Sequence, residues 1–434
     1  MNTHTYVKTK YKDLLAAAAM NGKSVYENEL IKLSNLKAVR NQSKSHVSIQ
    51  YLFRTYWDAF FAEFKHKLRP TIIKNVEAMI ACKDLPKGYL FYECTSCDNY
   101  HLTGLSCHSR FCPSCGHKYR DERSIEIQKK LLNVPHRHFV FSVPFDMRPY
   151  FWKCRQLFDC LFQTVNQALT MSIRHSKCDH QTDVRLGFIS FLHTSGRPLN
   201  LHPHLHVLLA EQTIDKTGKS KPMSFFPFER LRKTFMYLLL TNVSKCLKLF
   251  ATKSLYHDFN KLRTKLIKQY QNGFYVNGPK ISEENTFYSS KKIADYISRY
   301  ASHPPIAESN ILSLDEETHQ VTWVYTPHED PAHPIKITEP VFSFIRKLIR
   351  HIHDYRFHQL RYYGFYANRS LRSAHKVKMV SAISIHIAQS RLKWRILLLK
   401  TFKFDPLICY CGSKMVLNLK HSYLNHNKEY ISDA

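Results

Sequence analysis

The sequence lacks any apolar run long enough to cross a membrane. A spanning helix needs about 18 or more consecutive apolar residues, whereas apolar runs such as Phe235–Leu240 and Ile396–Leu399 are far shorter. The N-terminus, Met1-Asn2-Thr3-His4, also lacks the charged and then apolar segments of a signal peptide. We therefore expect no membrane partner and a soluble, intracellular protein, in which the twelve cysteines are metal ligands or buried thiols rather than disulfides.

Acidic residues are scarce relative to basic ones. The 434 residues contain 34 Asp and Glu against 64 Lys and Arg, a formal net charge of +30 at pH 7. A hydrophobic content of 44% excludes a mainly disordered chain, and the absence of a fixed-period repeat argues against a solenoid. The length predicts two to four domains. A folded protein with this charge is expected to bind a polyanion, and nucleic acid is the leading partner.

Helical and strand patterns alternate irregularly along the chain. Apolar residues between 47 and 82 recur at helical spacing, and Pro70 separates two predicted helices. This irregular mixture favours an α+β fold over a regular βα repeat. Strands are predicted at 138–144, 186–193 and 201–210, and helices at 122–133, 151–174, 229–270 and 291–301.

Two cysteine pairs, Cys94-Thr-Ser-Cys97 and Cys112-Pro-Ser-Cys115, are separated by fourteen residues (98–111). Two such pairs can surround one Zn²⁺ tetrahedrally, although the separation is slightly below the usual range of about 15–20 residues. We predict that Cys94, Cys97, Cys112 and Cys115 hold one structural Zn²⁺. Four further residues of this segment could replace a ligand or support a second site: His101, Cys107, His108 and His117.

Three histidines occupy alternate positions in the apolar run Asn200–Leu209. Alternate side chains of a strand share one face, so His204 and His206 would point the same way. Two neutral imidazoles in this arrangement are suitable ligands for a divalent cation. His202 precedes a proline, and for this residue metal and non-metal roles remain equally open.

The histidine run resembles the signature of HUH nucleases, in which two histidines hold Mg²⁺ or Mn²⁺ and a tyrosine attacks the scissile phosphate. Tyr296 and Tyr300 fit this expectation, because an i,i+4 pair lies on one face of a helix. The pair alone is a weak signal in a chain with 25 tyrosines, since ordinary packing produces the same spacing.

Together these motifs are similar to the insertion-sequence-91 family of rolling-circle transposases, the two-tyrosine HUH type. The likeness extends from about residue 50 to 417 and includes five segments: Glu93–Cys115, Arg137–Pro144, Asp295–Tyr300, Arg361–Asn368 and Asp405–Gly412. One departure is that Cys409 and Cys411 are separated by a single residue where the family often has Cys-x-x-Cys. This spacing argues against a second zinc site there, and whether Cys409 and Cys411 bind metal remains open.

The resemblance implies an α+β fold with an HUH-nuclease palm, an antiparallel sheet that carries His204 and His206 with the tyrosine helix beside it. A helical segment and a zinc-ribbon-like domain would precede the palm, and a mainly helical, basic part would follow it. The corresponding segments are an N-terminal helical segment (1–85), a zinc-binding domain (86–128), the nuclease domain (129–312) and a C-terminal DNA-binding region (313–434).

The resemblance also implies the reaction. Tyr296 or Tyr300 would attack single-stranded DNA at the element ends, leaving a 5′-phosphotyrosine and a free 3′-OH, in the bacterial cytoplasm near the nucleoid. Two other functions remain open: a plasmid replication initiator or relaxase, and a non-catalytic zinc-ribbon DNA-binding protein. The third ligand of the catalytic metal is open among four candidates: Asp183, His202, Glu211 and Asp295.

Overall fold

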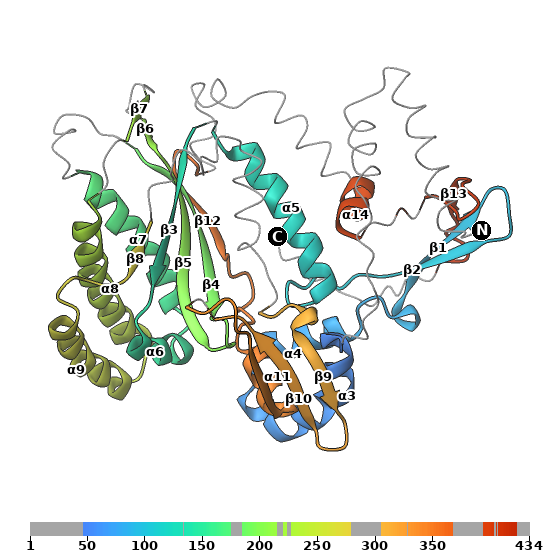
Figure 1. The fold of residues 1–434 in the computed structure, drawn as a ribbon, viewed down its shortest axis with the longest axis horizontal. Coiled ribbons are helices and arrows are strands. Elements are labelled where there is room, and N and C mark those ends of the chain that lie inside the picture. The colour runs from blue at the N-terminus through green and yellow to red at the C-terminus, as the bar shows by residue number, and fades with distance from the viewer. Residues whose placement is uncertain are drawn as a thin grey trace. The chain divides into compact units, whose positions relative to one another are not determined.

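Two compact units make up the described part of the protein. The computed structural model describes residues 47–132, 134–174, 185–214, 220–223, 227–278, 305–327, 329–367, 394–402, 405 and 407–422. The first unit contains the described residues up to Lys129 and those within Ser302–Phe357 and Ala382–Ala434. The second unit contains the described residues within Lys130–Ala301 and His358–Ser381. Each unit contains helices and antiparallel sheets (Figure 1), so the predicted α+β class is confirmed.

Both units combine segments that are distant in the sequence, unlike the four consecutive segments expected above. Strand β12 (Leu360–Gly364) comes from the segment assigned to the C-terminal region but belongs to the sheet of the second unit. Strand β13 (Met415–Leu417) pairs with β1 (Tyr89–Cys94) in the first unit. Pairing between remote strands is set by tertiary contacts, which local sequence patterns do not record.

The second unit is built on a five-stranded sheet in the order β12-β4-β5-β3-β8. All four pairings are antiparallel, and β5 lies in the middle between β4 and β3. The predicted strands at 138–144, 186–193 and 201–210 are therefore present. The remaining strand bounds of this sheet are β3 His136–Ser142, β4 Gly187–Ser195, β5 Leu201–Ala210 and β8 Val276–Asn277.

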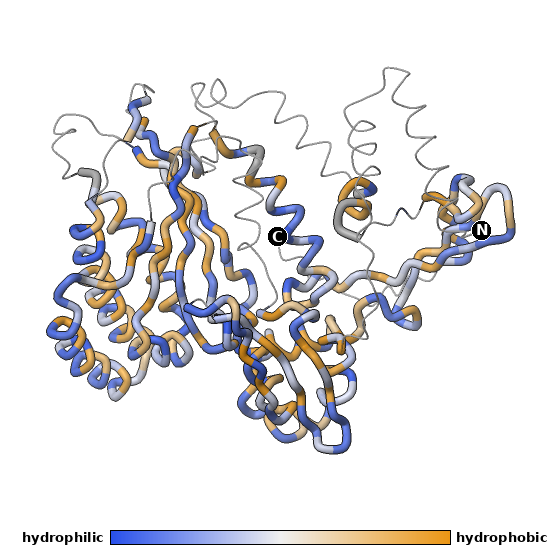
Figure 2. The backbone as a smooth tube through the Cα atoms, in the orientation of Figure 1, coloured by the Kyte–Doolittle hydropathy of each residue, from blue (hydrophilic) through white to orange (hydrophobic). Residues whose placement is uncertain are grey.

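Helices cover one face of this sheet (Figure 1). Phe141 of β3 meets Phe235 of α8 edge to face at a centroid distance of 5.1 Å, and Phe139 stacks on Phe228 at 5.5 Å. The strands are hydrophobic along most of their length (Figure 2). The histidines of β5 occupy alternate positions, and their side chains point to the face of the sheet opposite these helices. The helices of this unit are α6 Arg148–Lys153, α7 Leu157–Arg174, α8 Phe228–Phe250 and α9 Lys253–Gln269, and a short hairpin joins β6 Gln212–Ile214 to β7 Ser220–Pro222.

The first unit contains two three-stranded antiparallel sheets, β13-β1-β2 and β11-β10-β9. Trp323 of β10 is fully buried against Phe344 of α11, with ring centroids 5.9 Å apart, and its indole N–H donates to Glu339. The other elements are α3 Ile49–Phe64, α4 Pro70–Ile80, β2 Tyr100–Gly104, α5 Pro113–Lys130, β9 Ile311–Asp315, β10 Gln320–Tyr325, β11 Ile335–Pro340, α11 Val341–Ile349 and α14 Trp394–Phe402.

Several helix boundaries differ from the predicted ones. The helix expected at 122–133 begins at Pro113, because proline is well tolerated at a first helical position. The helix expected at 151–174 is divided into α6 and α7, since Cys154 has an extended conformation. The region 229–270 is likewise divided, where the Thr252 hydroxyl accepts from the Leu255 N–H and caps α9. Among the described helices, none has the length and apolar character required to cross a membrane.

Gly364 ends β12 with a φ of +59°, which disfavours any residue that has a Cβ. A Cβ there would overlap the carbonyl of Leu186, which already accepts from the Phe365 N–H at 3.0 Å. We predict that Gly364→Ala lowers the free energy of unfolding by about 1–3 kcal/mol, measured by urea denaturation. Gly196→Ala is the matched control, because its Cβ would meet the side-chain amide of Asn200, which can rotate away. Equal losses in the two variants would contradict this explanation.

Candidate metal centres

Three histidines converge on the face of the five-stranded sheet opposite the helices. His193 of β4 lies directly opposite His204 of β5 in the antiparallel register. His206 follows His204 by two residues on the same strand face. One ligand nitrogen from each of the three rings lies within 4.8 Å of the other two. His206 is buried, whereas His193 and His204 are half-buried. These three residues, the histidine triad, could hold one divalent cation.

Hydrogen bonds orient the rings of the triad. The Nδ1 atom of His204 lies 2.7 Å from the carbonyl oxygen of His202, which can only accept, so the proton is on Nδ1 and Nε2 carries the lone pair. The Nδ1 atom of His206 lies 2.9 Å from Nε2 of His138 on β3, and these rings stack with an interplanar angle of 9°. If His206 donates this proton to His138, its Nε2 becomes the ligand atom. Such outer partners fix the tautomer of a metal-binding imidazole.

Burial keeps two rings of the triad, His204 and His206, in the neutral form. Burial lowers the pKa of His204 to about 4, and burial also lowers the pKa of His206 well below its usual value. The neighbouring histidines act in the same direction, because protonated imidazoles repel one another. A neutral imidazole offers a lone pair to a cation, and a protonated one does not.

The structure brings His204 and His206 together, as the strand pattern predicted, and adds His193. This third histidine was missed in the sequence. It lies at the end of a predicted strand that a turn at 194–198 connects to the histidine run, and this hairpin signal could have identified it.

Neither of the two described candidates for a third ligand, His202 and Glu211, is part of the triad. His202 instead contacts the Ser142 hydroxyl, with Nε2 2.6 Å from Oγ. Glu211 forms an ion pair with Arg137 at 2.6 Å. Asp183 and Asp295 lie outside the described residues, as do the predicted nucleophiles Tyr296 and Tyr300.

Eight cysteines form two separate groups in the first unit. In cluster 1, Cys82, Cys107, Cys112 and Cys115 have sulfur atoms within 4.8 Å of one another. The Sγ atom of Cys115 lies 3.6 Å from that of Cys82 and 3.7 Å from that of Cys107. A tetrahedron with metal–sulfur bonds of about 2.3 Å has edges of about 3.8 Å. Cluster 1 therefore has the dimensions of a Zn²⁺ site with four thiolates.

Cluster 2 contains Cys94, Cys97, Cys409 and Cys411, whose sulfur atoms also lie within 4.8 Å of one another. The two predicted Cys-x-x-Cys pairs are thus divided between two clusters, which corrects the single site expected from their spacing. Cys94 ends β1 and Cys97 follows in the connection to β2, whereas Cys112 precedes α5 and Cys115 lies in its first turn. Each pair therefore takes its remaining ligands from elsewhere in the chain.

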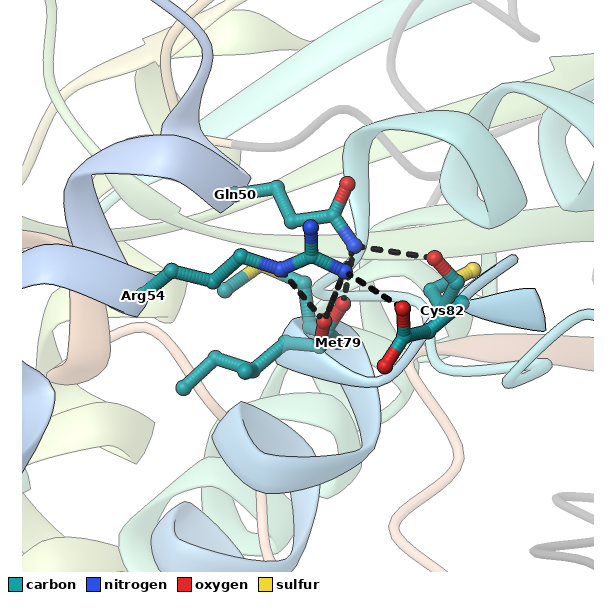
Figure 3. A network of polar contacts seen from close by, with 6 residues as sticks. Gln50, Arg54, Met79 and Cys82 are labelled. Carbon is teal, nitrogen blue, oxygen red and sulfur yellow. Dashed lines mark hydrogen bonds and ion pairs between the residues drawn. The ribbon is translucent and has the colours of Figure 1, made fainter. Parts of the chain in front are cut away.

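Cys82 reaches cluster 1 because helix α3 holds the end of α4 in place (Figure 3). The side-chain amide of Gln50 donates to the carbonyl oxygens of Met79 and Cys82, at 3.0 and 2.9 Å. The Arg54 guanidinium donates to the Ile80 carbonyl at 2.9 Å. These donors satisfy the carbonyl groups left without intrahelical partners at a helix C-terminus, where positive charge is favourable. No local pattern marks Cys82 as a ligand, and sequence reasoning missed it.

Comparisons with known proteins match both units. Residues 52–143 match a family described as "Transposase zinc-binding domain", and residues 187–374 match one described as "Putative transposase". The chain is 27% identical over 361 residues to the "Transposase for insertion sequence element IS801" of Pseudomonas savastanoi pv. phaseolicola, covering 80% of this chain and 84% of that protein. It is 24% identical to the "Putative transposase y4qJ" of Sinorhizobium fredii, covering 75% and 82%. No solved structure gives a significant match.

His138 is expected to act on the metal through His206. We predict that His138→Ala weakens Mn²⁺ binding by about 10–100-fold, measured by calorimetry, because His206 loses the partner that orients its ring. His138→Gln should recover most of the affinity, since its amide oxygen can still accept a hydrogen bond. The exposed His257 on α9 provides the control His257→Ala. Wild-type affinity in His138→Ala would show that this contact does not position the ligand.

Proposed function

Because the chain belongs to the insertion-sequence-91 family of transposases, we propose that it cuts and rejoins single-stranded DNA by metal-assisted tyrosine transesterification during rolling-circle transposition. The observation that carries this proposal is the convergence of His193, His204 and His206 within 4.8 Å on one face of an antiparallel sheet. A protein that only binds DNA has no need of three imidazoles in this arrangement. The expected substrates are the ends of the mobile element, in the bacterial cytoplasm near the nucleoid.

The donor set of the triad suits Mn²⁺ better than Mg²⁺. Imidazole nitrogens favour transition metals, whereas Mg²⁺ prefers oxygen ligands and several bound waters. Three protein ligands also leave coordination positions for phosphate oxygens and water. A divalent cation bound here would neutralise charge that develops on the scissile phosphate and fix it for in-line attack.

The nucleophile is assigned to Tyr296 or Tyr300. The phenol has an ordinary pKa of about 10 and must lose its proton to attack effectively. Its oxygen forms a bond to phosphorus while the bond from phosphorus to the 3′ oxygen breaks, and the leaving oxygen takes up a proton. The products are a 5′-phosphotyrosine and a free 3′-OH. Rejoining reverses these steps without an external energy source, and two tyrosines allow two strands to be handled in succession.

Arg148 at the start of α6 is a candidate phosphate ligand. Burial of His202 lowers its pKa to about 4, and the positive charge of Arg148 is a second, smaller cause of this shift. It is also among the charges that lower the pKa of His204. The guanidinium therefore lies near the triad, while its Nε atom donates to the Val143 carbonyl at 3.3 Å. A guanidinium held in this way can contact a phosphate oxygen of the bound strand.

Removal of either central histidine should abolish nicking. We predict that His204→Ala and His206→Ala lose metal-dependent cleavage of labelled single-stranded oligonucleotides from the element ends, while DNA binding is largely retained. Each variant removes one of the three ligands that the described part of the chain supplies. The control is His333→Ala, a histidine whose side chain is 83% exposed. Unchanged cleavage in either triad variant would refute the assignment of the catalytic site.

Removal of both predicted nucleophiles should abolish the covalent intermediate. We predict that Tyr296→Phe combined with Tyr300→Phe yields no protein–DNA adduct on a denaturing gel, because phenylalanine has no oxygen to attack phosphorus. Tyr237→Phe, at an exposed position of α8, should form the adduct at the wild-type level. An adduct that persists in the double variant would place the nucleophile elsewhere in the chain.

A further inference from the structure

Cluster 2 connects two parts of the chain that lie far apart in the sequence. Cys97 and Cys409 are separated by 312 positions, yet their sulfur atoms lie 3.7 Å apart. The match to the transposase zinc-binding domain ends at residue 143 and therefore includes Cys94 and Cys97 but not Cys409 or Cys411. Cluster 1, in contrast, lies entirely within the matched residues.

The sulfur positions of cluster 2 suit a tetrahedral metal ion. The Sγ atom of Cys411 lies 3.5 Å from that of Cys94 and 3.6 Å from that of Cys97. These separations are close to the edge of about 3.8 Å expected for a Zn²⁺ ion with four thiolate ligands. They are far longer than a disulfide bond of about 2.05 Å.

Backbone turns direct the four thiols inward. In the first turn, the Ser96 N–H donates to the Cys94 sulfur at 3.4 Å, and the Asn99 amide donates to the Cys97 sulfur at 3.3 Å. Donors aimed at sulfur favour the thiolate form that binds metals.

A tight turn in the C-terminal segment compensates for the unusual spacing of Cys409 and Cys411. The Gly412 N–H donates to the Cys409 carbonyl at 2.9 Å, and Gly412 has a φ of +85°. The Cys409 N–H in turn donates to the Ser413 carbonyl at 2.9 Å. This turn brings both sulfur atoms to the same side although a single residue separates them.

The segment around these cysteines also pairs with the zinc-binding hairpin. Strand β13 is antiparallel to β1, with Cys94 opposite Met415. The Thr95 N–H donates to the Lys414 carbonyl at 3.1 Å, and the Asn418 N–H donates to the Phe91 carbonyl at 2.9 Å. Among the described residues, the buried apolar group here consists of Tyr92, Cys409 and Met415, with Leu90 and Leu407 half-buried against it. So small a core and a three-residue strand give little stability without a further bond.

We propose that Cys94, Cys97, Cys409 and Cys411 bind a second structural Zn²⁺, and that this ion fastens residues 407–422 to the β1–β2 hairpin. Zn²⁺ suits four thiolates in closed tetrahedral geometry, and each thiol releases its proton when the ion binds. The first unit is then held together by two ions, one of which joins its N-terminal and C-terminal segments. This proposal does not depend on the nuclease chemistry.

Thiol alkylation of the zinc-loaded, full-length wild type tests the proposal directly. Iodoacetamide labelling is followed by peptide mass spectrometry at increasing concentrations of a chelator. We expect all four cysteines of cluster 2 to be protected at first and then to become labelled together, at one chelator concentration. Immediate labelling of Cys409 and Cys411, with Cys94 and Cys97 still protected, would overturn the proposal.

A double variant provides a second test. Cys409→Ser with Cys411→Ser should lower the zinc content by one ion per chain relative to the wild type. Cys94 and Cys97 should become labelled while Cys107 and Cys112 stay protected. The control Cys246→Ser lies outside both clusters and should retain the wild-type zinc content. Unchanged zinc content in the double variant would overturn the proposal. DNA cleavage is not a readout, so failure here leaves the proposed nuclease function untouched.

Discussion

The antiparallel register between β4 and β5 is the constraint on which the histidine triad depends. The pairing of His193 with His204 places both rings on one face, while Leu205 and Val207 of β5 point into the opposite, helix-covered core. A shift by one residue would exchange the two faces and expose those apolar side chains. Burial of the core therefore enforces the geometry of the triad, and the fold holds its ligands together before any cation binds.

The surroundings of the triad make it suitable for repeated cation binding. Burial favours the neutral forms of His204 and His206, and the hydrogen bonds to the His202 carbonyl and to His138 orient these two rings. The backbone carbonyl costs no side-chain entropy, and His138 is fixed in a strand. Preorganised ligands bind a cation with little reorganisation, which is the usual requirement for a precise catalytic site.

Local patterns in the sequence predicted the parts of each site that lie close together along the chain. Alternation on one strand predicted that His204 and His206 share a face, and the Cys-x-x-Cys spacing predicted that Cys94 and Cys97 lie close together. Their partners depend on tertiary contacts: His193 is brought in by strand pairing, and Cys82 by the capping of α4 from α3. The single zinc site was inferred wrongly for the same reason, since spacing cannot state which pairs meet.

Cluster 1 also bears on the position of helix α5. Cys112 and Cys115 of cluster 1 flank the start of α5, a helix that carries Lys118, Arg120 and Arg123. Arg123 lies over the ring of Tyr119 at 4.9 Å, so part of this charge has a defined position. Four clustered thiolates would repel one another without a cation. A metal ion bound at cluster 1 would therefore hold the first turn of α5 in place.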